Sequence, residues 1–445
     1  MENSTAAKRS PSRRKEGITQ ITVSGYKSIS QEQSIEVRPL TILAGANSSG
    51  KSSIMQPLLL LKQTLESGYD AGALLLNGPH LRFTSAEQML PRVGRGGSVD
   101  TFYVGVRLGP DNALTVYFSR QPNKGFEIQQ MVHISKNDKT TLRLGMTHDE
   151  IVANLAPQVR DFHQVISREE KTEPEWKVVR DRCFLALETY SKGRRIGGSY
   201  LASIFAGAIG AVMHLPGLRG NPERTYPVTA VGPTFPGTFE KYVASVVVQW
   251  QAERTEGKLE KLGRDLKRLG LTWKVTAQPI NDTQVELQVG RLTHAARGGA
   301  HDLVSIADVG FGVSQTLPVL VALNAAKPGQ LVYLEQPEIH LHPNAQFGMA
   351  QVLADAASRG VRVVVETHSS LLLLGVQSLV AEGVIPPNLV KLHWFKRRDD
   401  GTTEVKSADL DEAGSFGDWP EDFAHVALEA ESRYLDAAEA RQRKN

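Results

Sequence analysis

Residues 45–53, GANSSGKSS, form a short polar segment whose residue types and spacing suit the binding of a phosphate chain. Gly45, Gly50, Lys51 and Ser52 fill the required positions of the pattern G-x-x-x-x-G-K-(S/T). Glycines let the backbone curl so that amide hydrogens and a helix N-terminus face an anion. Lys51 would then reach the β- and γ-phosphates of ATP, and the Ser52 hydroxyl would bind Mg²⁺. The other residues expected to contact ATP in this loop are Asn47, Ser48, Ser49 and Ser53.

A second polar group follows the apolar run 331–334. Glu335 ends that run, where its carboxylate would hold Mg²⁺ near Ser52. The next residue, Gln336, stands where nucleotide hydrolases usually have a second acid that polarises water. An amide orients water through hydrogen bonds but cannot accept its proton, so we expect slow hydrolysis.

Further candidate site residues lie just beyond Gln336 or at the end of the next apolar run. Glu338 and Glu366 are candidate substitutes for the missing general base, and His368 would donate to the γ-phosphate. Together with Glu338 and His368, His340 and His342 also permit a zinc-site interpretation. The absence of a further His/Cys cluster and the presence of a phosphate loop weigh against zinc. We therefore favour a single ATPase site.

Composition narrows the function classes. The 445 residues carry a net charge of +3, which is too even to indicate a strong nucleic-acid field, although a local basic groove stays possible. A single cysteine excludes an internal disulfide framework and fits the cytosol. Residues 1–16 are expected to form a basic solubilising tail, with a phosphate-binding arm as the alternative. The uncharged stretch 196–218 is rich in Gly and Ala, which favours a buried helix over a membrane span.

The elements that must position these residues follow from apolar periodicity. Strand-like patterns cover residues 18–23, 35–43, 102–107, 113–118, 126–134, 271–292, 330–334 and 361–365. Helical patterns cover residues 51–65, 147–166, 176–190, 239–269, 314–325 and 343–360, and another helix starts near Ser369. We expect Pro57 to bend the first helix. Strands and helices alternate in the N- and C-terminal parts, whereas the middle is expected to be mainly helical.

The motifs also occur in the order of a known family. GYKSI (25–29), the phosphate loop, DVGFGVSQ (308–315, here called the signature segment), LEQPEIHLHP (334–343) and ETHSS (366–370) succeed one another. In this order the chain resembles ABC-type ATPases of the SMC/RecF/OLD kind. More closely, it is similar to stand-alone bacterial AAA ATPases that carry a C-terminal tail like GSFGDWPEDF (414–423). The resemblance is loose between residues 68 and 300.

The resemblance implies roles for particular residues. Lys51 and Ser52 would be the Walker A residues, Glu335 the Walker B carboxylate and His368 the switch histidine. Tyr26 and Lys27 would border the nucleotide, and residues 338–342 would contact a second subunit. In the signature segment, Gly310, Gly312 and Ser314 would face the γ-phosphate of a partner's ATP. The HLPGLRG-like motif would place Arg219 or Arg224 near the site or in a structural salt bridge.

The resemblance implies an α/β fold, the ABC-type ATPase head of the P-loop NTPases. We expect an N-terminal mixed β lobe with Walker A (17–145), a mainly helical insertion (146–300), a C-terminal α/β lobe (301–398) and a tail (399–445). ATP would join two copies of the chain as a homodimer or larger homo-oligomer. Such ATPases often work in the cytoplasm beside a separate effector, commonly a nuclease or toxin in anti-phage defence. A RecF-like DNA-binding repair ATPase and a non-hydrolysing scaffold are the alternatives.

Overall fold

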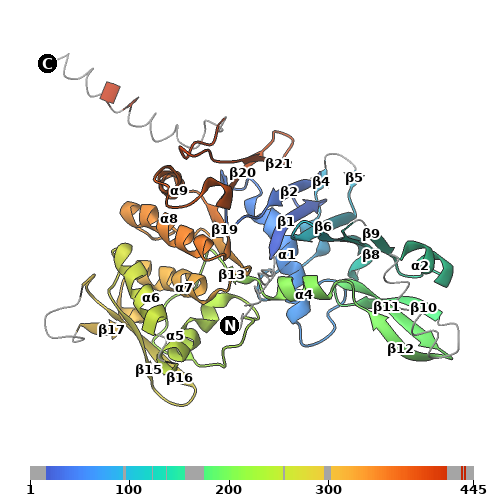
Figure 1. Cartoon of the computed structure of the whole chain (residues 1–445), viewed down its shortest axis with the longest axis horizontal. Coiled ribbons are helices and arrows are strands. Elements are labelled where there is room, and N and C mark those ends of the chain that lie inside the picture. The colour runs from blue at the N-terminus through green and yellow to red at the C-terminus, as the bar shows by residue number, and fades with distance from the viewer. Residues whose placement is uncertain are drawn as a thin grey trace, which may run out of the picture.

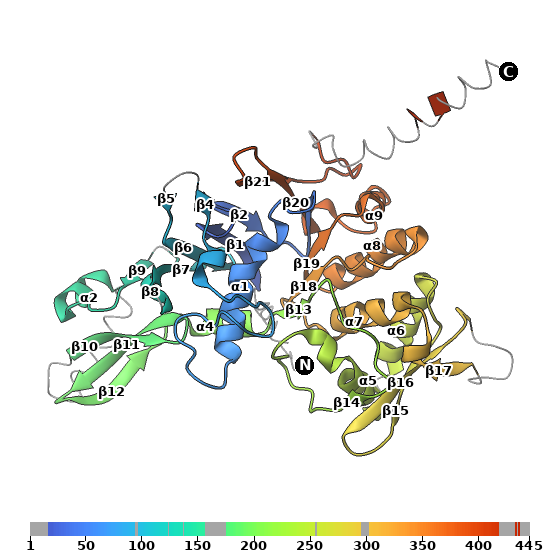
Figure 2. The same cartoon turned by 180° about the vertical axis from the view of Figure 1, so that it is seen from behind.

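The computed structural model describes residues 17–93, 97–122, 124–136, 138–155, 175–253, 256–294 and 302–417, together with 432–433 and 435–436. The expected basic segment 1–16 lies outside these residues. Two six-stranded sheets dominate the described chain (Figures 1 and 2).

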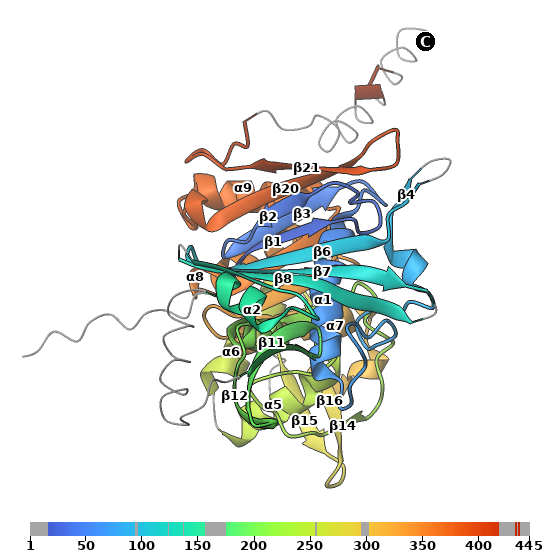
Figure 3. The same ribbon diagram turned by 90° about the vertical axis from the view of Figure 1, so that its right-hand side faces the viewer.

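The first sheet is antiparallel and builds the N-terminal lobe. Its strand order is β2 (Gln33–Glu36), β1 (Ile18–Ser24), β6 (Thr101–Leu108), β7 (Asn112–Gln121), β8 (Gly125–Ser135) and β9 (Asp138–Leu142). Strands β6 and β7, which cover the strand-like patterns 102–107 and 113–118, form a hairpin around the turn sequence GPDN, where Gly109 has φ 66°. Figure 3 shows β1, β6, β7 and β8 as successive strands beside helix α1.

The second sheet joins segments from both ends of the chain. Its order is β13 (Met213–Leu215), β18 (Leu331–Glu335), β19 (Arg362–Thr367), β3 (Leu40–Gly45), β20 (Val390–Arg397) and β21 (Thr403–Ala408). Strand β3 pairs in parallel with β19 on one side and β20 on the other. All six residues of β3 are buried, as expected for a central parallel strand.

The two faces of β3 belong to two different hydrophobic cores. Leu40 and Ile42 pack with helices α7 (Phe311–Ala325), α8 (Pro343–Ser358) and α9 (Ser370–Ala381). Leu43 packs with helix α1 (Lys51–Glu66) and the N-terminal sheet. Because side chains alternate across a strand, one buried strand ties both lobes to the loop that follows it.

Two smaller sheets interrupt the middle of the chain. One contains β10 (Glu175–Asp181), β11 (Phe184–Ser191) and β12 (Arg194–Ser199). The other contains β14 (Tyr226–Pro227), β15 (Val275–Pro279), β16 (Gln284–Gly290) and β17 (Leu303–Ser305). Figure 1 shows these sheets at opposite ends of the molecule. The helices of this region are α2 (His148–Asn154), α4 (Ser203–Gly210), α5 (Val243–Ala252) and α6 (Glu256–Arg268).

These sheets contradict the expectation of a mainly helical insertion over residues 146–300, because much of that region forms β-strands. The helix expected over 176–190 is the hairpin β10–β11, because Arg182 takes φ 53° and reverses the chain there. The helix expected over 147–166 is described only up to Asn154, and residues 156–174 lie outside the described chain. The long pattern 239–269 forms two helices, α5 and α6.

Two other boundaries also differ from expectation. The single run expected over 35–43 divides into β2 and β3, which belong to different sheets, with Pro39 between them. The segment from residue 399, expected as an appended tail, supplies β21 to the central sheet. No helix of the described residues is both long and apolar enough to cross a membrane. The uncharged stretch 196–218 forms part of β12, then α4 and β13.

Candidate nucleotide-binding site

The glycine-rich loop connects β3 to α1 at the carboxyl end of the central sheet. Gly45 has φ 148° and Gly50 has φ 103°, which side chains disfavour. A Cβ on Gly45 would lie 2.3 Å from the carbonyl oxygen of Phe395, and a Cβ on Gly50 would lie 2.3 Å from Thr403 Oγ1. Both glycines are therefore required by backbone conformation and by the close approach of β20 and β21.

Lys51 is folded back against its own loop. Its Nζ donates to the carbonyl oxygens of Gly45 at 2.9 Å and Ala46 at 2.8 Å. Burial lowers the pKa of Lys51 to about 8, and the charges of Glu366 and Glu338 oppose that shift. An enclosed ammonium held only by neutral carbonyls is well placed to gain an anionic partner such as a phosphate.

Glu366 is the carboxylate beside the Walker A serine. Its Oε2 accepts from Ser52 Oγ at 2.8 Å, and its Oε1 accepts from the hydroxyl of Tyr333. Burial, together with the nearby charge of Glu335, raises the pKa of Glu366 to about 7, although the hydrogen bonds from Tyr333 and Ser52 oppose the shift. A buried carboxylate without a directly bonded cation fits a divalent ion, and Mg²⁺ commonly binds one or two carboxylates together with phosphates. Ser52 and Glu366 are therefore the residues that would hold Mg²⁺.

Glu335, which we expected beside Ser52, makes other contacts. Its Oε1 lies 3.0 Å from His214 Nε2, and its Oε2 accepts from the Gly217 amide at 3.1 Å. Burial raises the pKa of Glu335, but the hydrogen bond from His214 and other positive partners lower it below its ordinary value overall. Strand register explains the difference. Glu335 and Glu366 are partners in adjacent strands, but β19 rather than β18 is the neighbour of β3.

Two of the remaining candidates, Gln336 and His368, line the cavity at the phosphate loop, and Glu338 does not. Gln336 has φ 44°, and its backbone N–H donates to the backbone carbonyl of Glu366 at 2.9 Å. Burial and the charge of Lys51 lower the pKa of His368. Glu338 Oε1 accepts from Thr367 Oγ1 at 2.6 Å and from the His368 amide at 3.0 Å. Its buried Oε2 has no hydrogen-bond partner in the described chain.

The turn after β1 contributes one of its two expected residues to the cavity. Lys27 lines it with φ 47°, and its Nζ donates to Gln56 Oε1 at 2.7 Å. The Tyr26 side chain is buried, and its hydroxyl donates to the same Gln56 oxygen at 3.1 Å. Tyr26 therefore supports Lys27 instead of lining the cavity.

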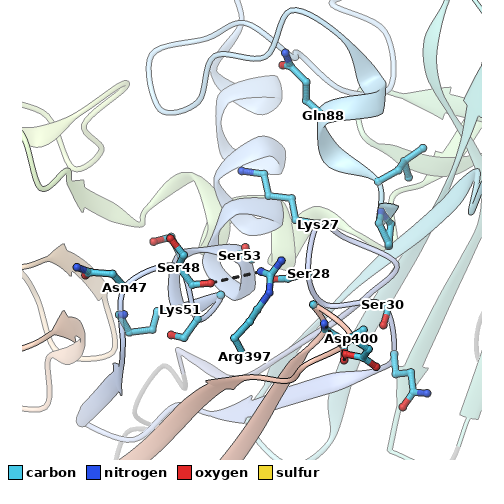
Figure 4. Close-up of a pocket in the computed structure, with 18 of the residues that line it drawn as sticks. Lys27, Ser28, Ser30, Asn47, Ser48, Lys51, Ser53, Gln88, Arg397 and Asp400 are labelled. Atoms are coloured by element: carbon cyan, nitrogen blue, oxygen red, sulfur yellow. Dashed lines mark hydrogen bonds between the residues drawn. The ribbon is translucent and has the colours of Figure 1, made fainter. Parts of the chain in front are cut away.

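The cavity has a volume of about 1280 Å³ (Figure 4). Its walls include the loop residues 47–53 together with Gln336, Glu366 and His368. Motif reasoning assigned no role to several other lining residues: Ser28, Ser30, Gln31, Glu87, Gln88, Leu90, Pro91, Arg397 and residues 400–402. The conspicuous signal for the last segment was the turn-forming sequence RRDDG, which gives no indication of where the turn lies in space.

The signature segment lies elsewhere in the chain's own structure. Gly312 and Ser314 do not line the cavity. They belong to the first turn of α7, where Ser314 Oγ donates to the Phe311 carbonyl at 3.2 Å. Phe311 is 53% exposed. Within one copy of the chain, the structure therefore does not bring the expected signature contacts to the phosphate loop.

The HLPGLRG segment (214–220) connects these two regions. Arg219 donates to the Gln315 carbonyl in α7 at 3.0 Å and to the Glu335 carbonyl at 2.8 Å. Burial lowers the pKa of Arg219 to about 10. Arg224 instead forms an exposed ion pair with Asp308 at 2.7 Å.

The histidines that permitted a zinc interpretation have other contacts. His342 caps α8 by accepting from the Asn344 amide at 3.4 Å, and the His340 ring lies 6.0 Å from the Phe311 ring. Among the described residues, no group of three or more His, Cys, Asp or Glu side chains is arranged to hold a metal ion. The Ser52–Glu366 pair is smaller than such a group because phosphate oxygens and water supply the other ligands of Mg²⁺.

Comparison with known proteins agrees with this arrangement. A family model described as "AAA domain, putative AbiEii toxin, Type IV TA system" matches residues 242–374, a span that includes the signature segment, Glu335 and His368. No curated protein sequence matches the chain at a significant level.

Solved structures of SMC heads match nearly the whole chain. An SMC head bound to the C-winged helix domain of ScpA is 12% identical with a TM-score of 0.50, covering 89% of this chain and 99% of that one. The heads from Pyrococcus furiosus (10% identity, TM-score 0.47, 95% and 99% coverage) and Thermotoga maritima (10%, 0.39, 88% and 100%) match less well. The chain thus has the fold of an SMC-type head, the ABC-type P-loop ATPase fold expected from its motifs.

Proposed function

We propose that the chain binds ATP with Mg²⁺ and hydrolyses it slowly. The observation that carries this proposal is the convergence of Lys51, Ser52, Gln336, Glu366 and His368 on one cavity. Phosphoryl transfer depends on positioning and charge neutralisation, and these residues offer both. Lys51 would bind the phosphates, His368 would donate to the terminal phosphate, and Ser52 with Glu366 would hold the magnesium ion.

Slow hydrolysis is supported by the contacts of Glu338 and Glu366, the two candidate general bases. Gln336 would orient the attacking water, but it cannot take the proton. Both oxygens of Glu366 already accept hydrogen bonds, and Glu338 does not line the cavity. Neither candidate substitute therefore presents an unengaged carboxylate oxygen to the water. A long-lived ATP-bound state follows.

ATP would also join two copies of the chain. The signature segment does not reach the loop in its own chain, and the exposed Phe311 stands at the start of α7. Gly312 and Ser314 would complete the site of a second copy, with residues 338–342 at the same interface. The site would then be whole only in a dimer.

The ATP-bound dimer would gate a separate effector in the cytoplasm, in an anti-phage defence system. Two comparisons support an effector of this kind. The matched family is described as a putative toxin of a toxin–antitoxin system, and the matched SMC head is bound to a domain of a separate protein, ScpA. A RecF-like DNA-binding role is the second candidate. A net charge of only +3 gives it little support, and it requires ATP-dependent duplex binding with a steep salt slope.

The test is Lys51→Ala in the full chain, with the exposed Lys406→Ala as control. We expect Lys51→Ala to weaken ATP binding at least about a hundredfold, because a charge-assisted phosphate contact is lost, and to abolish ADP production. Lys406→Ala should match the unmodified chain. ADP production that survives Lys51→Ala would contradict the proposed ATPase. ATP-driven dimers without any ADP would favour a scaffold.

A further inference from the structure

The cavity has a second wall on the opposite side of β3. Gln336 follows β18, Glu366 lies in β19 and His368 follows β19, and both strands lie on one side of β3. Arg397 and residues 400–402 come from the β20–β21 hairpin on the other side. Gln336, Glu366 and His368, the residues suited to phosphoryl transfer, therefore lie on one wall of the cavity. Because phosphoryl transfer takes place at the terminal phosphate of ATP, that phosphate would lie at this wall. An extended nucleotide with its terminal phosphate there would place its nucleoside end against the hairpin.

The hairpin is fastened directly to the phosphate loop. Thr403, which is 3% exposed, donates from Oγ1 to the Ser49 carbonyl at 2.8 Å. The same hydroxyl lies 2.8 Å from Ser28 Oγ, and the Thr403 amide donates to the Ser28 carbonyl at 2.7 Å. Three bonds from one residue therefore hold β21 against both the loop and the turn after β1.

The tip of the hairpin is also ordered by its own hydrogen bonds. Asp400 Oδ1 accepts from the Thr402 amide at 2.8 Å and from the Thr402 hydroxyl at 2.6 Å. Gly401 takes φ 81°, and its amide donates to the Arg398 carbonyl at 2.9 Å. Side chains on this turn are thus held before any ligand arrives, which lowers the entropic cost of binding.

Arg397 ends β20 and Arg398 follows it, and of these two only Arg397 lines the cavity. Arg397 Nη1 donates to the Ser48 carbonyl at 3.4 Å, a long bond that leaves most of the guanidinium donors for another partner (Figure 4). Arg398 does not line the cavity, and its Nε pairs with Glu404 at 3.3 Å. Successive side chains of a strand point to opposite faces, which explains the contrast.

We propose that the β20–β21 hairpin forms the nucleoside side of the site and that Arg397 binds the sugar and first phosphate of the nucleotide. This inference rests on the proposed ATP binding. The planar guanidinium of arginine suits this place because it donates to phosphate oxygens in a fork and packs flat against a sugar or base. Asp400 and Thr402 flank it with oxygen acceptors for sugar hydroxyls.

Calorimetric titration of the full chain with Mg²⁺ tests the assignment. The ligands are ATP, ADP and inorganic tripolyphosphate, and the variants are Arg397→Ala, Arg397→Gln and the control Arg398→Ala. We expect both Arg397 variants to weaken ATP binding about tenfold or more, since a charge-assisted contact is lost. ADP should lose affinity by the same factor. Tripolyphosphate, which keeps a phosphate partner for Arg397 but has no sugar or base, should lose less affinity than ATP, and Arg398→Ala should leave all three affinities unchanged.

The outcomes separate this inference from the function on which it rests. If the unmodified chain binds no ATP, the proposed function fails. If it binds ATP and the folded Arg397 variants bind equally well, only the hairpin assignment is overturned. Equal losses for ATP and tripolyphosphate would also overturn it, because Arg397 would then serve the phosphate chain. Thermal melting identifies folded variants, and Arg397→Gln retains the length of the side chain should Arg397→Ala unfold.

Discussion

The phosphate loop and the signature segment differ in how fully their own chain completes them. The loop is bonded to the β20–β21 hairpin through Thr403, and its lysine and serine have partners within 3 Å. The signature segment begins a helix with an exposed phenylalanine and contributes nothing to the cavity. One region is therefore complete when a single chain folds, whereas the other exposes Gly310 and Phe311 away from the cavity. This contrast supports the proposal that the chain carries two halves of a site that meet only between two copies.

The largest effect is expected when the phosphate loop and the signature segment are inactivated in separate copies of the chain. Lys51→Ala and Phe311→Asp should each abolish hydrolysis, the first by removing a phosphate contact and the second by placing a like charge near ATP. Mixing the two variants should restore hydrolysis, because a mixed dimer has one site with both halves intact. ADP release measured at varied mixing ratios provides the check. Mixtures that stay inactive while the unmodified chain hydrolyses ATP would mean that one copy acts alone.

The second-largest effect is expected at Arg219, whose guanidinium bonds both the signature segment and the end of β18. Arg219→Lys keeps the charge but loses the fork that reaches both α7 and the end of β18. We expect hydrolysis to fall about tenfold to a hundredfold, because the loss of each buried bond costs about 1–3 kcal/mol. ATP affinity should change far less, since Arg219 does not line the cavity. Arg224→Lys, in the exposed pair, is the control. Equal losses in both variants would show that Arg219 has no special coupling role.

A smaller effect is expected when the pH is lowered, which should reduce the stability of the sheet beside the phosphate loop. His393 in β20 is buried, with Nδ1 2.7 Å from Ser407 Oγ and Nε2 2.8 Å from the Glu36 carbonyl. Burial lowers the pKa of His393 to about 4. Below the ordinary value near 6.5 the unfolded chain binds a proton that the folded chain refuses, so stability falls between pH 6.5 and 4. The loss should reach roughly 2 kcal/mol at pH 5.

Urea unfolding at pH 7.5 and pH 5 measures this loss. His393→Gln should show a smaller drop between the two pH values, because it lacks the titrating ring. Other groups also titrate in this range, so the difference between the two chains is the quantity that matters. Parallel losses in both chains would remove His393 from the explanation.

The smallest expected effect is on the stability of the signature half. Because Phe311 is 53% exposed, Phe311→Asp should change the free energy of unfolding by no more than about 0.5 kcal/mol. Thermal melting without nucleotide checks this, and it also validates the mixing experiment. A large loss of stability would mean that Phe311 packs within its own chain, and the contrast between the two halves would weaken.

Local patterns predicted the parts of the site that are local in sequence. The phosphate loop, the buried strand before Glu335 and the helix opening at Pro343 depend on neighbouring residues and are confirmed as elements. Which carboxylate lies beside Ser52 depends on strand order, so the sequence assigned the magnesium ion to Glu335 and offered Glu366 only as a candidate general base. The helical periodicity expected over 176–190 failed because the turn at Arg182 interrupts it. The hairpin wall could not be foreseen because Thr403 and Ser49 lie 354 residues apart.

That separation has a consequence for synthesis of the chain. At about 5–20 residues per second, the ribosome needs roughly 20 to 70 s to make the residues between Ser49 and Thr403. During this time β3, with all six residues apolar or buried in the final fold, lacks its neighbours β19 and β20. We expect the nascent chain to need shielding from aggregation there. A fragment that stops before residue 390 would carry the complete phosphate-loop motif but lack the wall of the cavity that β20 and β21 supply.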